Sequence, residues 1–241
     1  MDTIEITSAV VDGVRLDFPT ERQIVALASA WDDDANHQVC FLRDSDFRAA
    51  GKQGEYASMI ASADLALPSS ATLFKYAAAK AAGNRKVSGR AGENGMVRRF
   101  FTAGERRREY LASLDSAEES AVPGGTAYAP LKTLACFLSA LEQRRGSVFL
   151  VGGSLPILQK AEQHMRSTFP ELRVVGRAAG DYREDDELAI MKALQKSTPD
   201  MIVVGSLVRG AELWIPRHMH CTKSGIFLYA DSIMEILAGR R

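Results

Sequence analysis

The sequence predicts an α/β fold: a Rossmann-like, largely parallel sheet flanked by helices, preceded by an N-terminal hairpin. In the C-terminal half, four short apolar runs alternate with amphipathic helical patterns, which is typical of βαβ units. Near the N-terminus, Asp12-Gly13 lies between two alternating runs and predicts a hairpin. The 241 residues, 46% of them hydrophobic, are enough to bury a substantial core. We therefore expect a single α/β domain over residues 1–241.

Local signals mark the elements of the first ninety residues. Thr20 and Gln23 have the spacing of a capping box, so a helix is predicted to begin after Thr20. Further elements are expected in chain order: a strand at 39–42, a helix from 47 to about 61, a strand at 64–67, and an Ala-rich helix from 69 or 70 to about 82.

The C-terminal half is predicted to supply four further strands and the helices that connect them. The strands are expected at 148–151, 172–175, 201–204 and 226–229. Apolar residues three or four apart indicate two helices, with Leu155, Leu158, Ala161 and Met165 in the first and Leu188, Met191 and Leu194 in the second. A last helix is expected from about 231 to 237, followed by Gly239.

Residues 90–130, approximately, are interpreted as a surface insertion. Basic and acidic blocks alternate there with Gly and Pro, and one helix is expected at about 105–114. Two interpretations stay open for its aromatic and basic residues at 97–101 and 106–108. They form either a contact for an anionic membrane surface or, as charge runs usually do, a solvated face.

Composition excludes several classes of protein. Lys plus Arg and Asp plus Glu number 30 each, so a global attraction to nucleic acid is not expected. No long apolar stretch predicts a membrane span, and no signal peptide is indicated. Cys40, Cys136 and Cys221 are far apart, which predicts neither a disulfide framework nor a metal site. Cys40 and Cys136 lie in apolar runs and are expected to be buried.

Ligands of parallel sheets bind at the carboxyl ends of the strands, and two glycine-containing edges are candidates. The first is Gly152-Gly153-Ser154, and the second carries Gly176, Gly180 and Tyr182. The first edge forms either an ordinary strand–helix turn or a close approach of backbone N–H groups to a phosphate or sugar. The second edge either shapes a pocket for a base or sugar or is a loop with two positive-φ positions.

Two further edges carry polar and aromatic residues. Gly205, Glu212 and Trp214 follow the strand at 201–204. Glu212 either binds ligand hydroxyls above Trp214, or it favours a helix N-terminus while Trp214 lies in the core. Asp44 and Asp46 follow the strand at 39–42, where a carboxylate acts either as a general base or as a helix cap.

In order and spacing, these edges resemble the WecG/TagA/CpsF glycosyltransferase family. The resemblance is good over about 147–239 and loose over 3–90, where it adds Ser69 and Lys86 to the site. The stretches that carry it are VFLVGGS at 148–154, FPELRVVG at 169–176, GDY at 180–182, PDMIVVG at 199–205, ELWI at 212–215 and AG at 238–239.

The resemblance implies transfer of an N-acetylmannosamine-type sugar from a UDP-sugar to a polyprenyl-diphosphate-linked acceptor. Such inverting enzymes work in cell-envelope polysaccharide biosynthesis, with the UDP-sugar as substrate and without a further cofactor. The resemblance also implies a cytoplasmic protein that meets its lipid-linked acceptor at the inner face of the bacterial membrane. It leaves homo-oligomerisation open.

Several positions depart from the family pattern. An Asp-Gly pair, whose Asp is the favoured base, reads Ser69-Ser70 here, and the usual arginine reads Lys86. The Gly-x-Pro-x-Gln-Glu edge reads 207–212, with the Gly, Pro and Gln replaced. Serine is no base at neutral pH, so an active enzyme would use Asp44 or Asp46. The alternatives are a catalytically inactive homologue that binds nucleotide sugars or acts as a scaffold, and an unrelated Rossmann-like binding module.

Overall fold

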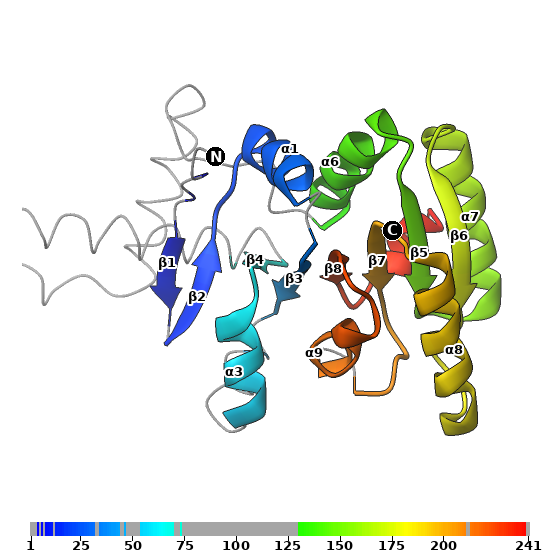
Figure 1. The fold of residues 1–241 in the computed structure, drawn as a ribbon. Helices are drawn as coiled ribbons and strands as arrows, with labels where there is room; N and C mark the ends of the chain where they lie inside the picture. The colour runs from blue at the N-terminus through cyan, green and yellow to red at the C-terminus, as the bar shows by residue number, and fades with distance from the viewer. Residues whose placement is uncertain are drawn as a thin grey trace, which may run out of the picture.

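A six-stranded parallel sheet and a separate antiparallel hairpin form the fold, which confirms the predicted class (Figure 1). The computed structural model describes residues 4, 6, 8–11, 13–31, 34–43, 46, 54–69, 73, 130–210 and 213–239. The order of strands across the sheet is β4-β3-β8-β7-β5-β6, and every neighbouring pair is parallel. The predicted insertion and the Ala-rich helix lie outside the described residues apart from single positions.

The strands of the sheet are β3 (Asn36–Leu42), β4 (Leu65–Pro68), β5 (Ser147–Val151), β6 (Arg173–Ala178), β7 (Met201–Val204) and β8 (Gly225–Tyr229). The hairpin pairs β1 (Ser8–Val11) with β2 (Val14–Asp17). The helices are α1 (Glu21–Ala30), α3 (Gly54–Ser62), α6 (Pro130–Gln143), α7 (Leu155–Thr168), α8 (Glu184–Ser197), α9 (Trp214–His218) and α10 (Ile233–Leu237), with a 3₁₀ turn, η3, at Met219–Cys221.

Local signals account for the start of the chain. Gly13 has φ +81°, a conformation that favours glycine in the hairpin turn. The Thr20 side chain accepts a hydrogen bond from the Gln23 N–H, and the Gln23 side chain accepts one from the Thr20 N–H. The predicted capping box is therefore present, and α1 begins where it was expected.

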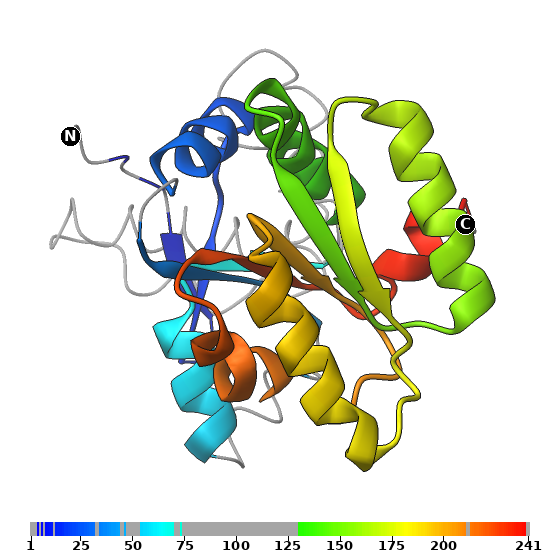
Figure 2. The same cartoon turned by 45° about the vertical axis from the view of Figure 1, so that its right-hand side comes forward.

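Alternate residues of the central strands point to opposite faces of the sheet, and helices cover both faces (Figure 2). On one face, Val148, Leu150 and Val203 pack in a core cluster with residues of α1, α6, α7 and α10. On the other, Phe149 and Val204 pack with residues of α8 and α9. Burial on both faces explains why these strands read as continuous apolar runs.

Helix α6 was not predicted from the sequence. It begins at Pro130, at the end of the Gly- and Pro-containing segment, and no capping pattern precedes it in the sequence. Its side chains at three- and four-residue spacing are nevertheless fully buried, namely Leu134, Phe137, Leu138 and Leu141. Stacked aromatic rings of Trp31 and Phe137, with centroids 6.0 Å apart, join it to the C-terminal end of α1. The helical period was therefore present in the sequence.

Three sequence expectations need correction. Leu155 and Leu188 were assigned to the apolar faces of helices but are exposed. Leu155 is the first residue of α7, and in α8 the buried residues are Ile190 and Leu194. Cys136 is half-buried rather than buried, whereas Cys40 is buried as expected. Burial raises the pKa of the Cys40 thiol to about 12.

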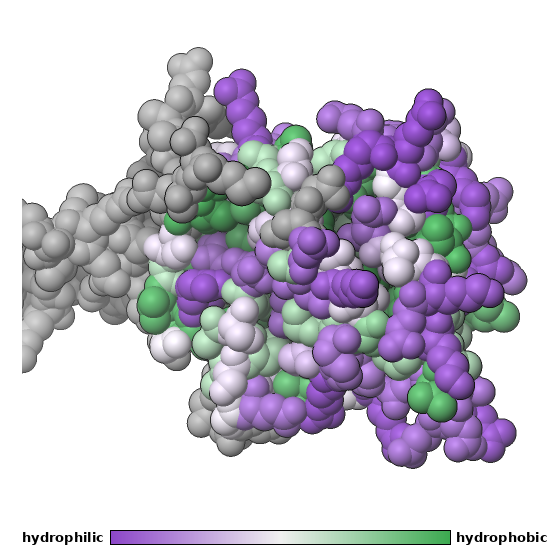
Figure 3. Space-filling view, viewed as in Figure 1, coloured by the Kyte–Doolittle hydropathy of each residue, from purple (hydrophilic) through white to green (hydrophobic). Residues whose placement is uncertain are grey.

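In the part of the chain that the structure describes, no helix is both long and apolar enough to span a membrane. Figure 3 shows that hydrophilic residues dominate the surface over α8 and that hydrophobic residues appear there as separate spots.

Candidate functional site

The direction of the chain reverses between β5 and β7 at the carboxyl edge of the sheet. From β5 the chain continues through α7 to β6 on one side, and from β7 it continues through α9 to β8 on the other. In open parallel sheets such a point opens a crevice that binds ligands. The two loops that border it begin at Gly152 and Gly205.

Close packing of these loops requires several of the predicted site glycines. A Cβ on Gly152, which has φ +122°, would lie 2.8 Å from the backbone of Gly205. A Cβ on Gly180 would lie 2.5 Å from the carbonyl oxygen of Ser206, and one on Gly176 would overlap the ring of Phe149. The fold itself therefore explains these glycines, and their contact with a ligand stays a prediction.

Backbone hydrogen bonds hold the same loops together. The Gly153 N–H donates to the Ser206 carbonyl at 2.7 Å, and the Gly180 N–H donates to the Gly153 carbonyl at 2.8 Å. Ser154 follows as the extended N-cap of α7, and its hydroxyl makes no capping hydrogen bond. Backbone hydrogen bonds thus join the loops that follow β5, β6 and β7, and Ser154 lies directly after the first of these loops.

Glu235 places a carboxylate beside these loops. The sequence analysis did not identify this residue. It lies on α10, and its Oε1 accepts a hydrogen bond of 2.9 Å from the Ser206 hydroxyl. Its Oε2 is buried and has no hydrogen-bond partner among the described residues. A buried carboxylate oxygen without a donor is costly, so this atom is suited to a hydroxyl or amide of a ligand. The only sequence signal was a glutamate within the apolar run 233–237.

Trp214 lies in the core, the placement that the sequence analysis had left open beside ligand contact. It is fully buried, and its Nε1 donates to the Tyr182 hydroxyl at 2.8 Å. That hydroxyl donates in turn to Glu187 on α8 at 3.1 Å. Burial raises the pKa of Tyr182 to about 12, so the phenol stays protonated. These contacts connect α9 to α8, and Glu212 lies outside the described residues.

Side chains rather than glycines organise the ends of β3 and β8. Asp46 is only 3% exposed, and its two carboxylate oxygens accept from the Arg43 N–H at 2.6 Å and from Arg43 Nη2 at 3.4 Å. Arg43 Nη1 also donates to Asp231 at 2.9 Å. Asp46 thus caps the turn that begins at Arg43, and a role as base stays a prediction.

The other site residues predicted near β3 and β4 are Ser69, Asp44 and Lys86, and the structure describes only Ser69. The Ser69 N–H donates to the Leu42 carbonyl at 2.9 Å, which ties the end of β4 to the end of β3. Asp44 and Lys86 lie outside the described residues. Among the residues that the structure does describe, no three His, Cys, Asp or Glu side chains gather in a way that would hold a metal ion.

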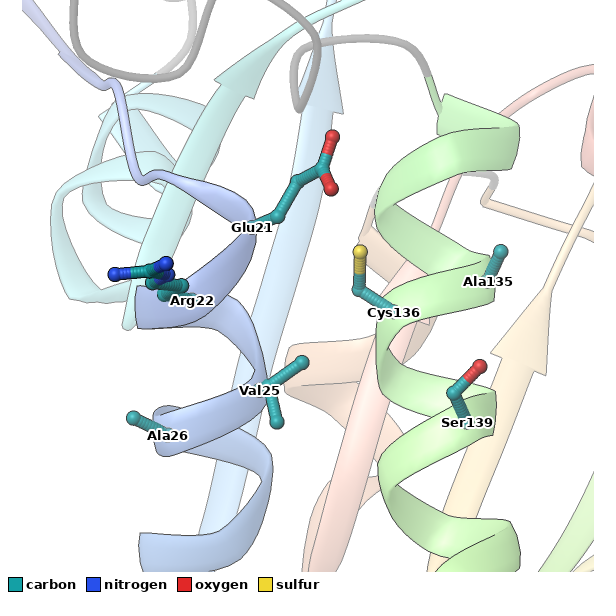
Figure 4. Close-up of a pocket in the computed structure, with 7 residues that line it drawn as sticks. All are labelled: Glu21, Arg22, Val25, Ala26, Ala135, Cys136 and Ser139. Carbon is teal, nitrogen blue, oxygen red and sulfur yellow. The ribbon is translucent and has the colours of Figure 1, made fainter.

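A separate groove of about 610 Å³ lies between α1 and α6 (Figure 4). Glu21 and Val25 of α1 and Cys136 of α6 point into the space between the helices. None of its lining residues belongs to the loops at the carboxyl edge. The groove is therefore distinct from the candidate site.

These features define an α/β protein with a Rossmann-like sheet and closely packed backbone loops at its switch point. Residues 123–241 match the family described as Glycosyl transferase WecG/TagA/CpsF. The match covers β5 to β8 and therefore both loops at the switch point. No curated protein matches the chain.

Proposed function

We propose that this protein is an inverting glycosyltransferase of cell-envelope polysaccharide synthesis. It would transfer an N-acetylmannosamine-type sugar from a UDP-sugar to a polyprenyl-diphosphate-linked acceptor at the inner face of the bacterial membrane. The observation that carries the proposal is the Ser206–Glu235 pair at the switch point, within the region that matches the family. Its unpartnered oxygen is an acceptor for a hydroxyl of the nucleotide sugar.

The charges of two helices that begin at this edge indicate where the diphosphate binds. Helix α7 has no acidic residue in its first turn, and its N-cap Ser154 leaves its hydroxyl unused. Helix α8 has four acidic residues in its first turn, which would repel a phosphate. N–H groups at a helix N-terminus favour anions, and they would also stabilise the UDP that leaves during transfer. The diphosphate is therefore assigned to α7.

Transfer also needs a base for the acceptor hydroxyl, and Asp44 and Asp46 are the candidates. Asp46 accepts hydrogen bonds from Arg43 on both carboxylate oxygens, so one of its remaining lone pairs would have to take the proton. Ser69 stands where the family pattern has Asp, which favours the second candidate function: an inactive homologue that binds nucleotide sugars without transferring them.

Calorimetric titration of the full chain with UDP and with UDP-N-acetylmannosamine tests the proposal. The wild type is expected to bind both, and Glu235→Gln to weaken binding by about tenfold, since one hydrogen bond to a charged acceptor is lost. Ser167→Ala, which removes an exposed hydroxyl at the far end of α7, is the matched control and should leave binding unchanged. Absence of UDP binding to the folded wild type would contradict the proposal.

Transfer is measured separately with a soluble polyprenyl-diphosphate-linked acceptor. Turnover supports the glycosyltransferase, and loss of turnover by about 10²–10⁴-fold in Asp44→Asn or Asp46→Asn would identify the base. Binding of UDP without turnover for any UDP-sugar supports the inactive homologue.

A further inference from the structure

Leu207 combines two unfavourable features at the candidate site. Its φ is +66°, in the left-handed region that residues with a Cβ seldom adopt. Its side chain is also 60% exposed, although it is a large aliphatic group. Neither feature is explained by the folding of the described residues, because a glycine would adopt the same backbone without strain and without exposing apolar surface.

Other residues of the structure show each feature alone. Thr198 and Arg145 also have positive φ, but Thr198 is the C-cap of α8 and Arg145 lies in the turn after α6, where polar residues are common. Leu188 is 64% exposed, but it lies on a regular helix. Leu207 alone among the described large aliphatic residues has both features.

The neighbours of Leu207 hold its backbone in place. The preceding residue, Ser206, accepts the Gly153 N–H through its carbonyl and donates its hydroxyl to Glu235. A Cβ on Gly180 would lie 2.9 Å from the carbonyl carbon of Leu207, so that loop packs directly against it. The following residue, Val208, is buried. Leu207 is thus anchored on both sides and presents an exposed side chain at the carboxyl edge of the sheet, next to Ser206.

We propose that Leu207 is a specificity-determining residue whose side chain packs against the base of the bound nucleotide. This inference rests on the proposed function. Of the three parts of a nucleotide sugar, the base alone has a broad apolar face, whereas the diphosphate and the sugar are polar. Covering Leu207 with that face removes exposed apolar area from water, and this gain offsets the backbone strain. Glu235, beside it, accepts a ribose hydroxyl.

Two variants and a control test the inference by thermal unfolding and by titration with UDP. Leu207→Asn accepts the left-handed conformation more readily and Leu207→Gly removes the side chain altogether. Leu207→Asn should raise the unfolding midpoint of the ligand-free protein by about 1–3 °C. Both variants should weaken UDP binding by about 5–20-fold, because an apolar contact is lost. Leu188→Ala, which removes an equally exposed leucine elsewhere, should leave UDP binding unchanged.

Other results of these measurements would contradict either the role of Leu207 or the proposed function. An unchanged UDP affinity in both variants overturns the inference while wild-type binding keeps the proposed function intact. A lower midpoint for Leu207→Asn overturns the premise of strain. A loss of affinity for UDP-N-acetylmannosamine but not for UDP places Leu207 on the sugar and overturns the contact with the base. Failure of the wild type to bind UDP contradicts the proposed function itself.

Discussion

The two sides of the carboxyl edge are held together in different ways. At β5, β6 and β7, backbone meets backbone, with Gly152 against Gly205 and Gly180 against Ser206. At β3 and β8, the Arg43 side chain donates to both Asp46 and Asp231. Where backbones touch, any added Cβ collides, so few residue types are compatible with the packing. Side chains that bridge a wider gap can be replaced more easily.

The family match includes the glycine-packed side and β8 but not β3 or β4. Residues 123–241, which contain the glycine-packed side, match the family. The β3–β4 side has Ser69 and Asp44 where the family pattern has other residues. On the glycine-packed side, the positions whose backbones touch are glycines, although the edge at 207–212 also departs from the family pattern.

The largest effect is expected for Gly152→Ala. The new Cβ would meet the Gly205 backbone at a residue with φ +122°, so both steric overlap and backbone strain result. We expect a loss of about 3–5 kcal/mol in the free energy of unfolding. Gly54→Ala is the control, since a Cβ there meets nothing within 4 Å and alanine favours a helix. Chemical denaturation measures both, and equal stability of the two variants would show that the close packing is not needed.

A smaller effect is expected for Asp46→Ala on the side-chain-held edge. Loss of the buried carboxylate leaves the Arg43 N–H without its acceptor, which costs about 1–3 kcal/mol in the free energy of unfolding. Asp231→Asn, at an exposed ion pair with the same arginine, should cost less than about 1 kcal/mol. Denaturation curves compare the two. A stability of Asp46→Ala equal to that of the wild type would refute the capping role.

At neutral pH the smallest effect is expected for Cys40, because its contribution to stability changes only at alkaline pH. Burial raises the pKa of Cys40 from 9.0 to about 12 in the folded protein, so between these values the folded state keeps a proton that the unfolded chain releases. Stability due to this thiol is therefore complete below about pH 9 and falls as pH rises to about 12. Cys40→Ala should show a shallower decline over this range in pH-dependent denaturation, and an identical slope would argue against the shift.

Tyr182 gives the corresponding test on the glycine-packed side. Its pKa is raised from 10.0 to about 12, so its contribution is lost over a narrower range than that of Cys40. Tyr182→Phe should reduce the decline above about pH 10 and should also remove the acceptor of the Trp214 Nε1 proton.

Much of the fold follows from signals that act over a few residues. The capping box at Thr20 and Gln23 closes within one helical turn, and the hairpin turn at Gly13 depends on one dipeptide. The apolar runs of the central strands reflect burial on both faces, so their number and parallel arrangement could also be predicted. Helix α6 was missed because its start has no cap signal and follows a segment without apolar periodicity.

The tertiary structure alone decided which residues form the candidate site. β5 and β7 are neighbours although β6 lies between them in the sequence, and this strand order places Ser206 beside Gly153 and brings Glu235 to the same point. The burial of Trp214 and the positive φ of Leu207 likewise depend on packing between distant segments. Hydrogen-bond periods and turn preferences are local and can be read from the chain, whereas contacts between loops depend on strand order, which no short stretch of sequence encodes.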